Sequence, residues 1–366
     1  MKIIPKSLLC FFMCCCVSLS QASTPLVYEN ARSLAMGGVS VSIADDEQAL
    51  FCNPAGLGQQ NKSKFSILNP FYAESKNFDK TLSAIDSLKD GDTAASREHN
   101  LNSLIRVMGK TGWRNRSNMS YYLGSTGFGI AAYYVDNETY FVDNPVNPRV
   151  GSKVDKDMVL SASISRPFKD SEEMFKDKSY GWWGATMKIA SRKTTNTSYF
   201  IRDFSALNPS LLKNTDKSGV AMDFDLSAIW QISNPMNPTF GVFAGNIFNA
   251  KFSDDAGNLE RQFGAGISIR PLTGDLERKN RILLALEYWD IGDVGNAFKK
   301  LRLGSQIQLS KTLHAHLGVR SGYPSYGFSF AWHDLELQAA MYSEELGKRP
   351  GDFEDKRCAF GATLEF

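Results

Sequence analysis

The sequence LRLGSQIQLSKTLHAHLGVR, residues 301–320, contains two short segments in which apolar and polar residues alternate. In the first segment Leu301, Leu303 and Ile307 share one face, and the opposite face is polar or glycine. The second segment repeats the pattern after the connector SKT. A hydrophobic period of two residues indicates a β-strand whose two faces meet different surroundings. The stretch therefore predicts an antiparallel hairpin with one apolar face.

The same alternation recurs along the chain and predicts 14 strands. They are expected at residues 63–70, 117–123, 127–134, 158–165, 181–191, 219–232, 239–248, 262–270, 281–290, 301–309, 313–320, 325–333, 335–342 and 357–366. The connections are mostly long after odd-numbered strands and mostly short after even-numbered ones; the long connection 166–180 and the short one 321–324 are exceptions. An even strand number with short turns at one end and long loops at the other is typical of an outer-membrane barrel.

A soluble β-sandwich also alternates, but its loops have similar lengths at both ends. The final stretch CAFGATLEF places Phe360, Leu364 and Phe366 on one face, and it resembles the C-terminal signal by which outer-membrane barrels are recognised for insertion. Because lipid offers no water to an open sheet edge, a sheet in the membrane must close on itself. We therefore predict an all-β fold, a 14-stranded antiparallel transmembrane β-barrel, in preference to a soluble all-β protein.

The first 22 residues have the features of an export signal. Lys2 and Lys6 precede the apolar run LLCFFMCCCVSL, and the small residues SQA precede Ser23. The run is too short for a membrane-spanning helix, which needs about 20 apolar residues. We expect a cleaved signal peptide at 1–22 and an outer-membrane location. A lipoprotein is the alternative, because cysteines cluster at 14–16, but bulky residues precede them.

Charge and cysteine content exclude several classes of function. Without the two lysines of the signal, the chain has 39 basic and 39 acidic residues, so no excess charge attracts nucleic acid. Only Cys52 and Cys358 remain outside the signal, which is too few for a disulfide scaffold. Cys358 shares its parity with Phe360 and is expected to point at lipid, so we predict two free thiols.

The stretch AMGGVSVSIADDEQALFCNPAGLG, residues 35–58, precedes the first barrel strand. GGVSVSI predicts a short strand, an aspartate before EQALF predicts a capped helical turn, and NPAG fits a type I turn. A 14-stranded barrel is too wide for its wall side chains alone to fill. The segment at 23–62 therefore lies in the periplasm or folds up inside the lumen, where it would plug the barrel expected at 63–366.

The stretch ARSLAMGGVSVSIADDEQALFCNPAGL resembles the FadL family of outer-membrane transporters for long-chain fatty acids and other hydrophobic compounds. The resemblance lies in the glycine-rich lead, the ADD element and the Asn-Pro-Ala motif. It implies that this motif belongs to a lumenal hatch, so we expect a hatch at 23–62, and it leaves the substrate contacts unassigned. The residues assigned to the hatch are Asp45, Asp46, Asn53, Pro54, Ala55 and Gly56. The chain is also similar to PorV-like barrels of a secretion system in its N-terminal signature and in SEELG before the last strand.

The resemblance implies passive uptake of hydrophobic compounds such as long-chain fatty acids. The expected steps are capture by external loops, passage along an apolar strip in the lumen, and a shift of the hatch. The expected partners are outer-membrane lipid and the hydrophobic ligand. The alternative is a PorV-like binding platform or shuttle for secreted proteins.

Apolar residues on the inward face of strands are candidates for ligand contacts. TFGVFAGNIF, residues 239–248, is apolar on both faces, and an apolar side chain in a wet lumen is costly unless something covers it. It either packs on the hatch or lines a route for acyl chains. The candidates with this inward parity are Trp182, Ile229, Phe243, Ile247 and Leu283.

Other patterns offer weaker candidates for chemistry. His314, His316 and His333 have inward parity and could together form a metal-binding site. Polar side chains are also expected on the wall of a hydrated lumen, with or without a metal. Ser329 and Asp223 point inward, yet no spacing indicates a catalytic triad. We predict no metal, no cofactor and no enzymatic activity. The segment 71–116 has helical spacing, and we expect an extracellular loop that caps the rim or offers an apolar landing site for an amphipathic ligand.

Overall fold

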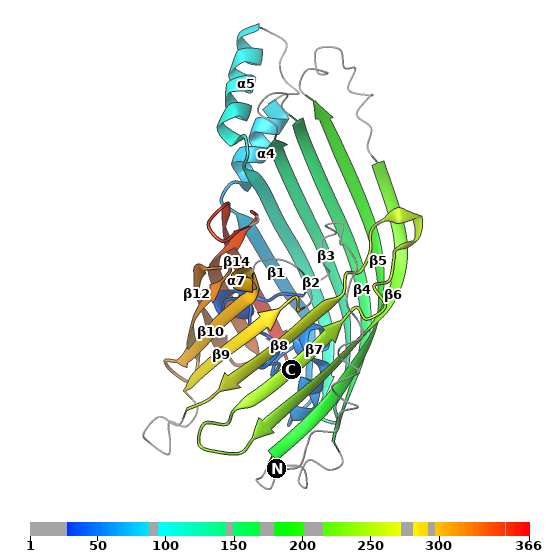
Figure 1. Ribbon diagram of the computed structural model, residues 1–366, viewed down its shortest axis with the longest axis vertical. Helices are drawn as coiled ribbons and strands as arrows, with labels where there is room; N and C mark the ends of the chain where they lie inside the picture. Colours follow the sequence, from blue (N-terminus) through cyan, green and yellow to red (C-terminus); the bar gives the residue numbers. More distant parts are fainter. Residues whose placement is uncertain are drawn as a thin grey trace.

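A computed structural model describes residues 28–87, 94–143, 149–168, 179–200, 215–271, 281–291, 297–347 and 349–366. The chain forms a closed antiparallel β-barrel of 14 strands in which each strand pairs with its neighbours in sequence and β1 pairs with β14 (Figure 1). The strands are β1 (Lys64–Ser75), β2 (Thr111–Gly124), β3 (Phe128–Asp143), β4 (Arg149–Pro167), β5 (Ser179–Phe200), β6 (Thr215–Ile232), β7 (Thr239–Gly245), β8 (Gln262–Ile269), β9 (Ile282–Trp289), β10 (Leu301–Gln308), β11 (Leu313–Arg320), β12 (Tyr323–Trp332), β13 (Leu335–Glu345) and β14 (Glu354–Glu365). The predicted strand number and the closed barrel are confirmed.

The barrel is much taller on the side formed by β2 to β6 (Figure 1). β3, β4 and β5 have 16, 19 and 22 residues, whereas β8 to β11 have 8 each. The loops expected at 135–157 and 192–218 are therefore partly strand, and the prediction was wrong there. The extensions escaped detection because polar residues interrupt the alternation on both faces: Arg192 and Asp157 pair inside the barrel, while Lys156 and Lys193 are exposed outside.

The two faces of the wall differ as the alternation predicts. Side chains of outward parity are apolar and exposed; Phe328, Phe360 and Leu160 each leave about half of their surface uncovered. Inward parity brings polar side chains such as Asp225 and Ser163, which are fully buried. Among the described residues, no helix is long and apolar enough to cross a membrane.

The N-terminal segment, which we define as residues 28–60, fills the lumen. It contains α2 (Ala31–Ala35), α3 (Ala49–Cys52) and the 3-10 helix η1 (Pro54–Gln59). The strand expected at GGVSVSI does not form. The backbone N–H groups of Ser40 and Ser42 donate to the carboxylate of Glu287 on β9 instead of to a paired strand. The predicted signal peptide at 1–22 lies outside the described residues.

Two helices, α4 (Phe78–Asp86) and α5 (Ala94–Val107), connect β1 and β2. The predicted helical segment 71–116 is shortened at both ends, because β1 continues to Ser75 and β2 begins at Thr111. Ile85 and Leu104 pack against Val142 and Val150, which have outward parity on β3 and β4. The helices therefore cover the outer face only where β3 ends and β4 begins.

The β7–β8 loop, residues 246–261, folds into the barrel. Phe252 and Leu259 are buried in one apolar cluster with Tyr28 and Phe51 of the N-terminal segment, and Tyr133 on β3 belongs to the same cluster. The N-terminal segment and the loop thus share a continuous core across the lumen.

Candidate functional site

Glycines allow the N-terminal segment to lie directly against the barrel wall. Gly37 has a φ of +73°, and a Cβ there would lie 2.5 Å from the carbonyl oxygen of Leu303. On β5, a Cβ at Gly184 would lie 2.2 Å from the backbone nitrogen of Ala55. Any larger side chain at either position would push the segment away from the wall.

The NPAG turn is built as its sequence predicts. The Gly56 N–H donates to the Asn53 carbonyl at 2.9 Å, and Pro54 begins η1. Asn53 is fully buried; its Nδ2 donates to the Val41 carbonyl at 2.6 Å, and its Oδ1 accepts from the Ala55 N–H at 3.2 Å. The Ala55 N–H also donates to Ser227 Oγ on β6 at 2.9 Å. The four predicted residues of the motif therefore lie together against the wall.

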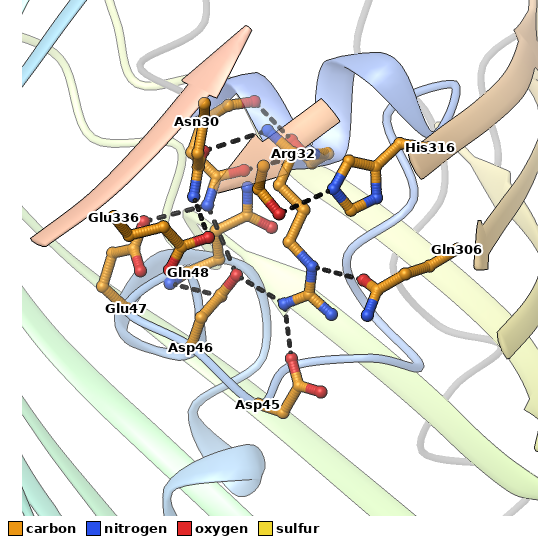
Figure 2. Close-up of polar contacts among 12 residues, drawn as sticks. Asn30, Arg32, Asp45, Asp46, Glu47, Gln48, Gln306, His316 and Glu336 are labelled. Atoms are coloured by element: carbon orange, nitrogen blue, oxygen red, sulfur yellow. Dashed lines mark hydrogen bonds and ion pairs between the residues drawn. The ribbon is translucent and has the colours of Figure 1, made fainter. Parts of the chain in front are cut away.

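Arg32 is the centre of an ionic cluster inside the barrel (Figure 2). Its Nη1 lies 2.7 Å from Asp45 Oδ1 and 2.9 Å from Asp46 Oδ2. Its Nε donates to Gln306 Oε1 on β10 at 2.9 Å. Just beyond the end of β8, Arg270 Nη2 reaches the other oxygen of Asp45 at 3.0 Å. The two predicted aspartates thus connect the N-terminal segment to itself and to the wall. Asp46 also accepts from the Gln48 N–H at 3.0 Å, as in an Asx turn, but no side chain caps α3, so the predicted capped helical turn does not form.

The acids of this cluster differ in their proton affinity. Burial, followed by the charge of Asp46, raises the pKa of Glu47 to about 7. Burial would also raise the pKa of Asp45, but the charges of Arg32 and Arg270 outweigh it and lower that pKa. Tyr28 Oη and Asn30 Nδ2 each donate to Glu47 Oε1 at 2.9 Å. Burial therefore makes Glu47 harder to ionise than an ordinary carboxyl group.

The predicted ligand contacts mostly cover the N-terminal segment. Phe243 packs against Val41, and Leu283 packs against Met36. The other positions are as follows: Trp182 contacts the backbone at Gly58, Ile229 is fully buried on β6, and Ile247 is half-buried in the β7–β8 loop just beyond β7. Their role in ligand binding stays a prediction.

The weaker candidates for chemistry are dispersed. His316 Nε2 and Ser329 Oγ lie 3.0 Å apart on β11 and β12, and the other ring nitrogen of His316 has no partner among the described residues. Asp223 is used elsewhere, because its carboxylate accepts from the backbone of the β7–β8 loop. His333 lies in the exposed turn after β12. Within the described ranges, no group of three side chains is placed to hold a metal ion.

Both predicted thiols are free in the structure. Cys52 is buried in α3, where burial raises its pKa to about 12. Cys358 on β14 has the parity of the exposed Phe360, and its Sγ contacts the Glu74 carbonyl at 3.8 Å.

Sequence reasoning placed Asp223 on the inward face but missed the structural role of several charged residues that hold the lumen together. Glu287, Arg302 and Arg320 contact the N-terminal segment, and Asp223 and Asp225 hold the β7–β8 loop. The sequence does show that these residues lie on the inward face of strands whose outward face is apolar. A polar lumen makes that signal common, so it does not single out these five.

No protein-family model matches the sequence, and no curated protein matches it. Solved structures do match across nearly the whole chain. The TodX deltaS2S3 mutant monoaromatic hydrocarbon channel superposes with a TM-score of 0.53 at 12% identity, over 93% of this chain and 98% of that one. The Pseudomonas putida toluene transporter TodX gives 0.48 at 11% identity and CymD, a monoaromatic hydrocarbon channel, 0.46 at 12%, each over 93% of this chain and 98% of theirs. At these identities the likeness concerns the fold alone. The chain has the fold of the TodX channel, and its resemblance to FadL-type barrels is confirmed at the level of the fold.

Proposed function

We propose that this protein is an outer-membrane transporter for the passive uptake of hydrophobic compounds, with long-chain fatty acids as the preferred class. One observation carries the proposal: the barrel exposes apolar side chains to its surroundings while its own N-terminal segment fills the lumen. A sheet with an exposed apolar outer face is stable in hydrocarbon. A lumen filled by the same chain, rather than by wall side chains, can be emptied without unfolding the wall.

The N-terminal segment acts in this proposal as the hatch. Phe243 and Leu283 are covered by Val41 and Met36, so a shift of the segment uncovers an apolar strip along β7 and β9. The Asn53–Gly56 turn and the cluster of Asp45 and Asp46 hold the closed position. The ligand reaches the strip after capture by the external loops.

Uptake into liposomes tests this proposal. Full-length protein reconstituted from detergent should carry both palmitate and toluene across the bilayer, faster than protein-free liposomes do. Mass spectrometry of small molecules released from the purified protein should find a hydrophobic compound. Absence of any uptake, together with copurification of a secreted protein, would favour the PorV-like platform instead.

A polar substitution tests whether the ligand passes along the apolar strip. Phe243→Asn should lower uptake, because a ligand would meet an amide where it now meets a ring. Phe240→Asn is the matched control on the outer face of the same strand. Both variants should be checked for barrel assembly by heat-modifiable gel mobility.

A further inference from the structure

Two arginines face each other on the inner wall of the barrel. Arg302 on β10 and Arg320 on β11 are direct cross-strand partners. Their guanidinium groups flank Gly38, where a Cβ would lie 3.1 Å from Arg320 Nη1 and 3.4 Å from Arg302 Nη1. Like charges directly opposite each other on neighbouring strands are destabilising unless anions lie between them. The anions near this pair therefore explain why it is tolerated.

The N-terminal segment supplies one of these anions. Arg320 Nη1 donates to Glu29 Oε1 at 2.8 Å, and its Nη2 lies 3.2 Å from Glu344 Oε1 on β13. Glu344 belongs to the wall, whereas Glu29 belongs to the N-terminal segment.

Arg302 has no comparable carboxylate partner. Its Nη1 donates to the Gly38 carbonyl at 2.6 Å, and its guanidinium lies 4.3 Å above the Trp289 ring. No carboxylate forms an ion pair with it in the described part of the chain. Its cross-strand neighbour Glu287 already accepts from Ser40, Ser42 and Trp289 Nε1. A second carboxylate oxygen placed between the two arginines would therefore complete the pairing.

An apolar surface begins beside this pair. The Trp289 ring lies beneath Arg302 and packs against Phe243, with 6.0 Å between ring centroids. Val41 of the N-terminal segment covers the same cluster. A charged end and an adjoining apolar strip match the two parts of an amphipathic carboxylate.

We propose that Arg302 and Arg320 form a binding site for the carboxylate of a fatty acid, and that Glu29 occupies this site in the closed barrel. This inference rests on the proposed function and assigns its head-group contact. Paired guanidinium groups bind carboxylates with charge-assisted hydrogen bonds, and the chain of the ligand lies along Trp289 and Phe243.

Ligand binding then competes with closure. A carboxylate that takes the place of Glu29 removes the bond from Glu29 to Arg320 and loosens the start of the N-terminal segment. By reciprocity, any change that weakens the Glu29 contact must strengthen binding of the ligand carboxylate. A neutral ligand of the same chain length gains nothing from the site.

The test compares palmitate with hexadecanol, which has the same chain length without the carboxylate. Detergent-purified full-length protein is titrated with each compound, as wild type, Glu29→Gln, Arg302→Gln and Arg320→Gln. Because a hydrogen bond to a charged group contributes about 1.5–3 kcal/mol, Glu29→Gln should bind palmitate about tenfold more tightly and each arginine variant about tenfold more weakly. Hexadecanol affinity should change less than about twofold in all of them by the same reasoning.

Arg116→Gln provides the matched control, since Arg116 lies on the outer face of β2 with half of its side chain exposed. It should leave both affinities unchanged. Equal binding of palmitate by wild type and Glu29→Gln would overturn the inference, even if the arginine variants failed to assemble. In that case uptake of toluene or hexadecanol would still support the transporter, whereas loss of all binding and uptake would reject both proposals.

Discussion

Asn53 shows how much one buried side chain contributes to the closed lumen. Its amide reaches Val41 on one side and Ala55 on the other, and it has no exposed surface. The sequence pointed to this residue as the start of a turn, and the structure adds the second bond to Val41.

Asn53→Ala should loosen the N-terminal segment without disturbing the wall. The buried Val41 carbonyl loses its donor, which costs about 1–3 kcal/mol, while the Ala55 N–H keeps Ser227 Oγ as its acceptor. Hydrogen exchange of residues 28–60 should therefore become faster, while exchange in the strands is unchanged. Asn61→Ala, at an exposed position just beyond the segment, is the control. Equal protection in the two variants would contradict the role of the Asn53 amide.

At the residue scale, we also expect the stability of the closed N-terminal segment to depend on pH through Glu47. Its pKa is raised to about 7 by burial and by Asp46, so the closed segment favours the protonated form. This stabilisation is fully present below the ordinary carboxyl pKa and is lost as the pH rises through about 7. Asp46 and Arg32 belong to the same cluster, and Tyr28 and Asn30 donate to the carboxylate.

Hydrogen exchange of residues 28–60, normalised to the intrinsic rate, should accelerate between pH 6 and pH 8. Glu47→Gln carries no titrating proton and should abolish most of this change. Glu98→Gln, on the exposed side of α5, should keep it. A wild-type profile that stays flat over this range would show that Glu47 does not control closure.

At the scale of elements, the β7–β8 loop closes the lumen together with the N-terminal segment. The Asp223 carboxylate accepts from the Phe248 and Ala250 N–H groups at 3.0 and 2.8 Å. Asp225 accepts from the Asn246 N–H at 2.7 Å and from Lys188 Nζ at 2.8 Å. Two wall aspartates thus fold an otherwise external connection inward.

Gly219→Ala should release this loop. A Cβ at Gly219 would lie 2.2 Å from the Ser253 carbonyl oxygen, so the loop backbone must move. Such overpacking typically costs 1–3 kcal/mol, so we expect exchange of residues 246–261 to accelerate about tenfold. Gly361→Ala is the control, because its nearest neighbours would lie 3.8 Å away. Unchanged loop protection in Gly219→Ala would refute the close contact.

At the scale of elements, the sequence pattern predicts the existence of the strands but not all of their ends. The alternation located all 14 strands, because each crosses a region with one apolar and one polar side. It failed at the extensions of β3 to β5, where Arg192 and Asp157 pair on one face and lysines occupy the other. Strand pairing there depends on neighbours distant in sequence, which a local period cannot register.

On the scale of the whole molecule, two segments close the lumen. The N-terminal segment and the β7–β8 loop meet in one apolar cluster through Tyr133. Removing either closure leaves the other in place, so their effects on permeation should not add.

Planar-bilayer conductance measures this property. Deleting residues 28–60 alone, or introducing Gly219→Ala alone, should raise conductance only slightly above wild type. Combining the two changes should raise it by much more than the sum, because only then is the lumen open along its length. A fully open channel from the deletion alone would show that the loop is no barrier.

The sequence by itself determined the number of strands, their inward and outward faces, and an N-terminal segment inside the barrel. These features are local, since a period of two residues and a proline turn are written within a few positions. Only the tertiary structure decided which inward side chains are covered and which charges meet. Arg320 pairs with Glu29 across 291 positions of sequence, and Arg302 faces Arg320 only because β10 and β11 share one register. Closing the barrel brings such residues together, so the contacts that hold the lumen shut follow from closure and not from any single stretch of the chain.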